Sequence, residues 1–76
     1  MTISIVIPLY NEEENIRELH SSLKPVMDSV GDEYEIIFID DGSTDKTLPL
    51  LQEIQQEDDT VIVLSLYPQP PQEIIL

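Results

Sequence analysis

Three short runs of apolar residues divide the sequence, and the two longer segments between them repeat apolar residues every three or four positions. The runs lie near residues 3–9, 35–39 and 60–66 and are rich in isoleucine and valine. Their length and composition are typical of β-strands. The periodicity of the segments between them is typical of amphipathic helices. The pattern therefore predicts strands and helices in alternation, β-α-β-α-β.

The first helix is expected to begin at Asn11 and to run to about Val30. Asn11 is a favoured N-cap residue, Glu14 follows three residues later as in a capping box, and the neighbouring glutamates suit the positive end of a helix. Gly31 can end the helix in a left-handed conformation. His20 lies beside the apolar stripe, where a lone histidine is more often a boundary residue than a ligand. The stripe expected to face the sheet consists of Ile16, Leu19, Leu23, Val26, Met27 and Val30.

The second helix is expected to start at Thr44 or Asp45 and to end near Glu57. Pro49 would cost it a hydrogen bond unless the regular helix begins only at Thr47. The residues that it should bury are Leu48, Leu51 and Ile54.

These elements predict an α/β fold with a parallel sheet. Strand-helix-strand units are right-handed almost without exception, and their strands lie parallel. The second strand is apolar on both faces, which is typical of a strand covered by helices on both sides. We expect half of a doubly wound, Rossmann-like fold, with strand one either between the other two strands or beside strand two.

Residues 1–66 are expected to form one small domain, followed by an extended proline-rich tail at residues 67–76. The prolines prevent the tail from pairing in a sheet or continuing a helix. A chain of 76 residues without cysteine has a core of marginal stability. We therefore expect either a truncated chain or a homo-oligomer, and the apolar residues 74–76 could dock on a neighbour.

Acidic residues outnumber basic ones by 16 to 3, so the formal net charge is −13. This balance argues against nucleic acid and anionic membranes as direct partners, because both are bound through clustered lysine and arginine. No run approaches the roughly 20 apolar residues of a membrane span, and the first residues do not resemble a signal peptide. The expected location is cytoplasmic.

The candidate chemistry lies at the carboxyl ends of the first two predicted strands. Asp40 and Asp41 follow the apolar run of strand two, and Tyr10 and Glu12 follow strand one. Ligands of open α/β sheets bind at this edge. An aromatic ring can stack on a base, and a carboxylate can accept a hydrogen bond from a ring N–H. A nucleoside is therefore a candidate ligand, and the alternative that both aspartates only cap a turn stays open.

The sequence lacks the glycine-rich loops that usually hold phosphate groups. Neither G-x-G-x-x-G after the first strand nor G-x-x-x-x-G-K-[ST] occurs. A diphosphate near this acidic edge would need a divalent cation to screen it, and Mg²⁺ or Mn²⁺ suits carboxylate ligands. No metal ligand is assigned within the chain itself.

Residues 5–12 and 37–45 together resemble the beginning of the inverting family 2 glycosyltransferases. Within that family the chain looks most like the branch of dolichyl-phosphate mannose synthases and bacterial polyprenyl-phosphate glycosyltransferases. The resemblance runs from about residue 3 to residue 66 and implies the nucleotide-binding part of a GT-A fold with a UDP- or GDP-sugar donor. It also implies a polyprenyl or dolichyl phosphate acceptor for the full-length protein, at the cytoplasmic face of a membrane. By this resemblance the donor site is lined by Pro8, Tyr10, Glu12, Ile39 and Asp41, with Asp40 as a neighbouring candidate.

The chain also departs from the family pattern. Family members bind metal through an Asp-x-Asp motif after a later strand, with the catalytic base further on, and neither follows Leu66 here. The chain is therefore expected to bind the donor without transferring sugar, and its catalytic residues are unknown. One alternative is a receiver-like signalling domain, but that would need an aspartate at the end of strand three, where this sequence has Ser65. Another is a non-catalytic fragment that associates through exposed sheet edges.

Overall fold

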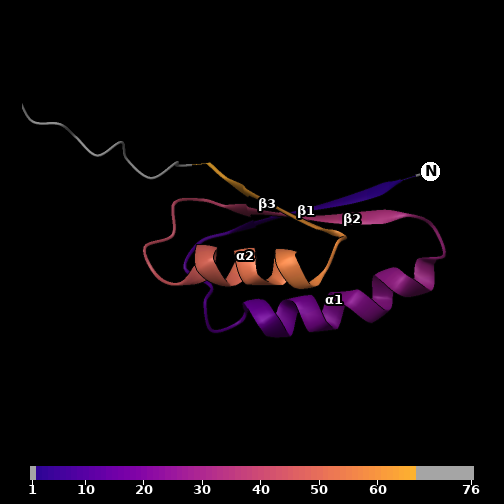
Figure 1. Cartoon of the computed structure of the whole chain (residues 1–76), viewed down its shortest axis with the longest axis horizontal. Helices are drawn as coiled ribbons and strands as arrows, with labels where there is room; N and C mark the ends of the chain where they lie inside the picture. Colours follow the sequence, from indigo (N-terminus) through magenta and orange to yellow (C-terminus); the bar gives the residue numbers. More distant parts are fainter. Residues whose placement is uncertain (1, 67–76) are drawn as a thin grey trace, which may run out of the picture.

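The computed structural model describes residues 2–66 and confirms the predicted alternation of strands and helices (Figure 1). The predicted tail, residues 67–76, lies outside the described residues. The elements are β1 (Ile3–Leu9), α1 (Ile16–Val30), β2 (Tyr34–Asp40), α2 (Thr47–Glu57) and β3 (Val61–Ser65).

The three strands form one parallel sheet in the order β1-β2-β3. β2 is the central strand. Of the two predicted strand orders, the one with strand one between the other two is therefore wrong, and the one with strand one at the outside, beside strand two, is correct. Because all pairings are parallel, the three strands end at one edge of the sheet, which we call the carboxyl edge. They begin at the opposite, amino edge. The register runs from Ile3 beside Tyr34 to Leu9 beside Asp40, and from Ile36 beside Val61 to Asp40 beside Ser65.

Both helices lie on the same face of the sheet (Figure 1). The prediction that the second strand is covered by helices on both sides is therefore wrong for residues 2–66. The physical reason lies in the connections: the chain steps from β1 to β2 to β3 in one direction, and right-handed crossovers that step in one direction place their helices on one side. The other face of the sheet carries no helix from the described residues.

The core lies between the sheet and the two helices. The stripe predicted for the first helix is correct at Ile16 and Met27, which are buried, and Leu19 and Leu23 are partly buried. It is wrong at the end of the helix, where Val26 is 59% exposed and Val30 46%. The buried core consists of Leu9, Ile16, Met27, Ile36, Phe38, Leu51, Ile54 and Val61.

Both helices begin later than predicted, whereas the first one ends where it was predicted to end. Helix α1 begins at Ile16, not at Asn11, and Asn11 has a left-handed backbone with φ 49°. Gly31 ends α1 with φ 85°, as predicted. Helix α2 begins at Thr47, later than the predicted Thr44 or Asp45. Pro49 therefore falls in the first turn, where a missing N–H costs no helical hydrogen bond.

Neither helix in the described part of the chain is long and apolar enough to cross a membrane. They contain 15 and 11 residues, against the roughly 20 that a membrane span needs. A cytoplasmic location stays a prediction from the sequence.

Candidate functional site

The carboxyl edge brings together residues that the sequence predicted for a ligand site. Tyr10 directly follows β1 and is 55% exposed, and Asp41 directly follows β2 and is also exposed. The Asp41 N–H donates to the carbonyl oxygen of Leu9 at 2.8 Å, which joins the two strand ends. Glu12, in the loop after Tyr10, is partly buried. Tyr10, Glu12 and Asp41 therefore belong to neighbouring loops at one edge.

Pro8 and Ile39 lie beside these residues on the face of the sheet that no helix covers. They are partners in the β1–β2 register, with Pro8 exposed and Ile39 partly buried. Side chains alternate between the faces of a sheet, and Tyr10 and Asp41 each stand two positions further along. The structure thus supplies an apolar floor next to an aromatic ring and a carboxylate.

Asp40 lies on the opposite face from Ile39, toward the helices. It is only 2% exposed, and its Oδ1 atom has no hydrogen-bond partner among the described residues. Asp40 and Asp41 thus have different surroundings although they are adjacent in sequence. A role for Asp40 in ligand binding stays a prediction, whereas Asp41 is open to solvent.

The loop after β1, residues 10–15, and the loop after β2, residues 41–46, are joined by hydrogen bonds. Asn11 Oδ1 accepts from the Thr44 N–H at 2.8 Å, and the Asn11 N–H donates to Ser43 Oγ at 2.9 Å. The Glu12 N–H donates to Thr47 Oγ1 at 2.8 Å. Sequence reasoning missed this role, because it treated Asn11 as a local helix cap. The side chains of Asn11 and Ser43 instead hold two loops that lie more than thirty residues apart.

Asp45 anchors the same pair of loops. Its carboxylate accepts from the Thr47 N–H at 2.8 Å and from the Thr47 hydroxyl, and the Glu13 N–H donates to it at 3.4 Å. Desolvation opposes the charged form, but these hydrogen bonds prevail and hold the pKa of Asp45 below its ordinary value. Asp45 is therefore an ionised structural group at the start of α2.

Tyr10 and Asp41 differ from these loop residues. Among residues 2–66, neither side chain has a hydrogen bond or an ion pair, although the polar residues around them do. Glu12 is intermediate, since its Oε2 atom accepts from Asn15 Nδ2 at 3.1 Å. The loops are thus fixed by the hydrogen-bonded side chains, whereas the side chains of Tyr10 and Asp41 are available to a ligand.

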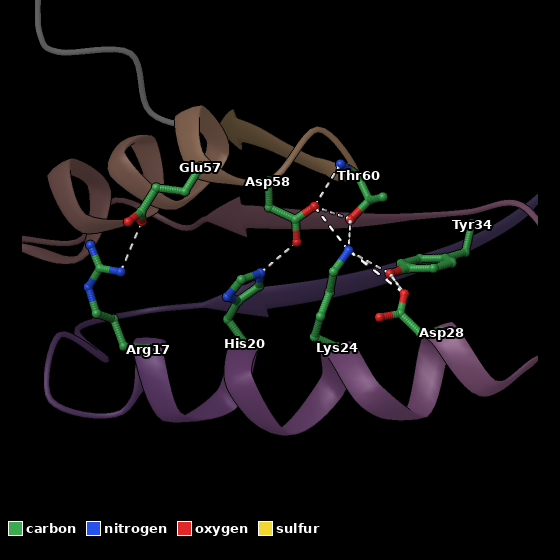
Figure 2. Close-up of polar contacts among 8 residues, drawn as sticks. All are labelled: Arg17, His20, Lys24, Asp28, Tyr34, Glu57, Asp58 and Thr60. Atoms are coloured by element: carbon green, nitrogen blue, oxygen red, sulfur yellow. Dashed lines mark hydrogen bonds and ion pairs between the residues drawn. The ribbon is translucent and has the colours of Figure 1, made fainter.

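The amino edge has a different organisation, dominated by the buried carboxylate of Asp58 (Figure 2). Asp58 Oδ2 lies 2.7 Å from His20 Nε2, and Lys24 Nζ donates to Asp58 Oδ1 at 3.2 Å. The Thr60 N–H and hydroxyl donate to the same Oδ1 atom at 3.0 and 2.7 Å. Lys24 also donates to Tyr34 Oη at 2.7 Å. The network links α1 to the start of β2 and to the turn before β3.

Hydrogen bonding decides the charge of Asp58. Its side chain is 8% exposed, and desolvation alone would raise its pKa. The hydrogen bonds from Thr60, His20 and Lys24 outweigh that effect and hold the pKa far below the ordinary value of an aspartate. The pKa of Lys24 is raised, mainly by its hydrogen bond to Tyr34. His20, predicted to be a boundary residue, takes part in this network with 18% of its side chain exposed.

Residues 2–66 contain no group of three or more His, Cys, Asp or Glu side chains placed to hold a metal ion. Asp40 is buried at the end of β2, whereas Asp41 is exposed in the loop after it. Binding of a divalent cation stays a prediction from the sequence.

The fold and this edge define a class of protein: a parallel, Rossmann-like half-sheet with exposed side chains at the carboxyl ends of its strands, where open α/β sheets bind their ligands. Comparison with known protein families identifies a family of this class. The model of the family described as glycosyl transferase family 2 matches residues 4–66. That is most of the chain, and it includes all of the sheet except Ile3, both helices and both loops of the candidate site. The chain belongs to glycosyltransferase family 2, and its architecture is consistent with half of a GT-A fold.

Proposed function

We propose that this chain binds the nucleoside part of a nucleotide-sugar donor at its carboxyl edge. The observation that carries the proposal is the contrast within the two loops: Asn11, Ser43 and Asp45 are engaged in holding the loops, while Tyr10 and Asp41 are exposed and have no partner among the described residues. Exposed side chains on loops that are already held by hydrogen bonds suit ligand contact, because binding then orders the side chains and not the loops as well.

Each side chain has a chemical role in this proposal. The Tyr10 ring stacks on the base, and the Asp41 carboxylate accepts a hydrogen bond from a base N–H or a ribose hydroxyl. Glu12 offers a second carboxylate, and Pro8 and Ile39 supply the apolar floor beneath the base. Asp40 contributes at most indirectly, because it is buried on the other face.

The diphosphate finds little basic charge in the described residues. Arg17 pairs with two glutamates of α2 at 3.6 and 3.0 Å, and Lys24 pairs with Asp58 at the amino edge. The third basic residue, the exposed Lys46, lies in the loop after β2 and is the one basic side chain of the described residues at the carboxyl edge. We therefore propose that Mg²⁺ or Mn²⁺ and later segments of the full-length protein hold the UDP- or GDP-sugar diphosphate. The acceptor proposed for that protein is a polyprenyl or dolichyl phosphate at the cytoplasmic face of a membrane. For residues 1–76 themselves we propose donor binding.

Calorimetric titration with UDP- and GDP-sugars in the presence of Mn²⁺ tests this proposal. Replacing Asp41 by alanine should weaken donor binding about tenfold to a hundredfold, the worth of a hydrogen bond to a charged group, roughly 1.5–3 kcal/mol. Asp59→Ala is the matched control, because it removes an exposed aspartate at the amino edge and should leave the affinity unchanged. Asp40→Ala tests the neighbouring position. Unchanged affinity in the Asp41 variant would show that this carboxylate only caps its turn.

The alternative function, association through the unpaired sides of the outer strands, has less support at β1. Odd-numbered residues of β1 bond to β2, as Ile3 does through its N–H to the Glu33 carbonyl and Leu9 through its carbonyl to the Asp41 N–H. Pro8 therefore faces the free edge and has no N–H to offer there. A proline at this position blunts the edge against a partner strand.

A further inference from the structure

Lys46 is a cation that the described residues leave unpaired. The chain has 3 basic residues against 16 acidic ones. Two of the basic side chains are held by carboxylates: Arg17 lies 3.0 Å from Glu57, and Lys24 lies 3.2 Å from Asp58. The side chain of Lys46 is exposed and, among residues 2–66, has neither an ion pair nor a hydrogen bond. In a chain so rich in carboxylates, this ammonium group is the exception.

The backbone of Lys46 is held at the carboxyl edge. Lys46 directly precedes α2, and its N–H donates to Glu13 Oε2, in the loop after β1, at 3.3 Å. Its carbonyl oxygen accepts from the Leu50 N–H at 3.1 Å. Both bonds use backbone atoms of Lys46, so they fix the position of the residue and leave its ammonium group free. Lys46 is therefore fixed on the same pair of joined loops that carries Tyr10 and Asp41.

The acidic side chains next to Lys46 are engaged by other groups of the loops. The Asp45 carboxylate accepts from the N–H and the hydroxyl of Thr47 and from the Glu13 N–H. Glu13 Oε2 accepts from the backbone of Lys46 and not from its ammonium group. These carboxylates hold the loops together instead of neutralising the lysine. An anionic group of a ligand is the partner that this edge leaves open to Lys46.

We propose that Lys46 binds the diphosphate of the donor whose nucleoside lies against Tyr10 and Asp41. This inference rests on the proposed function, which places a diphosphate at the carboxyl edge. An ammonium group is a compact charge with three donors on a flexible stem, so it can bind phosphate oxygens without the glycine-rich loops that the sequence lacks. It also offsets the repulsion between the diphosphate and the carboxylates of Glu12 and Asp41.

Calorimetric titration of the full chain with UDP or GDP and with the matching nucleoside, all without divalent cations, tests the proposal. Lys46→Met keeps a long apolar side chain and removes the charge. It should weaken binding of the diphosphate about threefold to tenfold and change binding of the nucleoside less than about twofold, because the nucleoside has no phosphate. The difference between wild type and variant should shrink at high salt, which screens exposed charges. Lys46→Arg keeps the charge and should retain most of the affinity for the diphosphate.

Arg17→Met is the matched control for the loss of one positive charge. It changes the net charge of the chain by the same amount, but Arg17 is already paired with Glu53 and Glu57 on α2. Affinity for the diphosphate should therefore change less than about twofold. Equal weakening by Lys46→Met and Arg17→Met would overturn the proposal, by showing that only the net charge matters.

Asp41→Ala separates this inference from the proposed function, because it should weaken the nucleoside and the diphosphate alike. A wild-type chain that binds neither ligand overturns both proposals. Weaker binding in Asp41→Ala with unchanged binding in Lys46→Met overturns only the role of Lys46. Equal losses of nucleoside and diphosphate affinity in Lys46→Met also overturn that role, since they would place the lysine away from the phosphates. Circular dichroism identifies the folded variants.

Discussion

The two edges of the sheet use carboxylates in opposite ways. At the amino edge, Asp58 is buried and surrounded by donors from α1 and from the turn before β3. At the carboxyl edge, Asp41 is exposed and without a partner among the described residues, beside the exposed ring of Tyr10. A satisfied, buried carboxylate stabilises the fold, whereas an unsatisfied exposed one is available to a ligand. The difference separates the part of the chain that maintains the fold from the part that can bind.

The largest effect is expected at the amino edge. Asp58→Ala should lower the free energy of unfolding by roughly 2–4 kcal/mol, because it leaves Lys24 and His20 without their shared partner in a partly buried site. Urea unfolding followed by circular dichroism measures this loss. Donor affinity per folded molecule should not change. A large loss of affinity in the folded variant would show that the two edges are not independent.

Acid should reveal the same carboxylate in the unmodified chain. The pKa of Asp58 is lower in the folded chain than in the unfolded chain, so its stabilisation is complete above the ordinary aspartate pKa of about 3.9. It is lost progressively as the pH falls below that value toward the folded-state pKa. Unfolding free energies measured from pH 7 downward should therefore fall more steeply below about pH 4 in the wild type than in Asp58→Asn. Parallel curves would contradict the assignment.

A smaller effect is expected at the carboxyl edge, from Asn11. Asn11→Ala removes the acceptor for the Thr44 N–H and places alanine in a left-handed conformation, so stability should fall by about 1–2 kcal/mol. Asn11→Gly is the matched variant, because glycine tolerates φ 49° and loses only the side chain. Here the donor affinity should fall together with stability, since Tyr10 adjoins the loosened loop. Thermal unfolding and calorimetry on both variants separate backbone strain from the lost hydrogen bond.

The elements and their order could be read from the sequence because they depend on local signals. Apolar runs, periodic helices and Gly31 each act within a few residues of themselves. The predicted site residues Tyr10 and Asp41 also reach one edge as expected, because parallel strands end together. The predicted start of α1 was wrong because it depended on a contact between residues distant in sequence. Asn11 is a residue type favoured at helix N-caps, but its side chain accepts a hydrogen bond from the Thr44 N–H in the loop after β2.

The amino-edge network could not be predicted because it requires knowing which turn packs against α1. One local signal was nevertheless present. The pattern Asp-x-Thr occurs at Asp45–Thr47 and again at Asp58–Thr60, and in both cases the threonine N–H and hydroxyl donate to the aspartate. Such turns are a local property of the pattern. The exposure of the second face of the sheet was not predicted either. It results from the handedness of the crossovers, whereas the apolar composition of β2 indicated helices on both sides of the sheet.

The strand order also bears on how the chain reaches this structure. No two neighbouring strands form a hairpin: Ile3 pairs with Tyr34, and Ile36 pairs with Val61, each across an intervening helix. Both pairings use β2, so neither outer strand can enter the sheet before β2 is in place. Two long loops must therefore be closed, at an entropic cost, before the ladder compensates. Both long-range pairings of the described sheet thus depend on β2, the same strand that carries Asp40 and leads into Asp41.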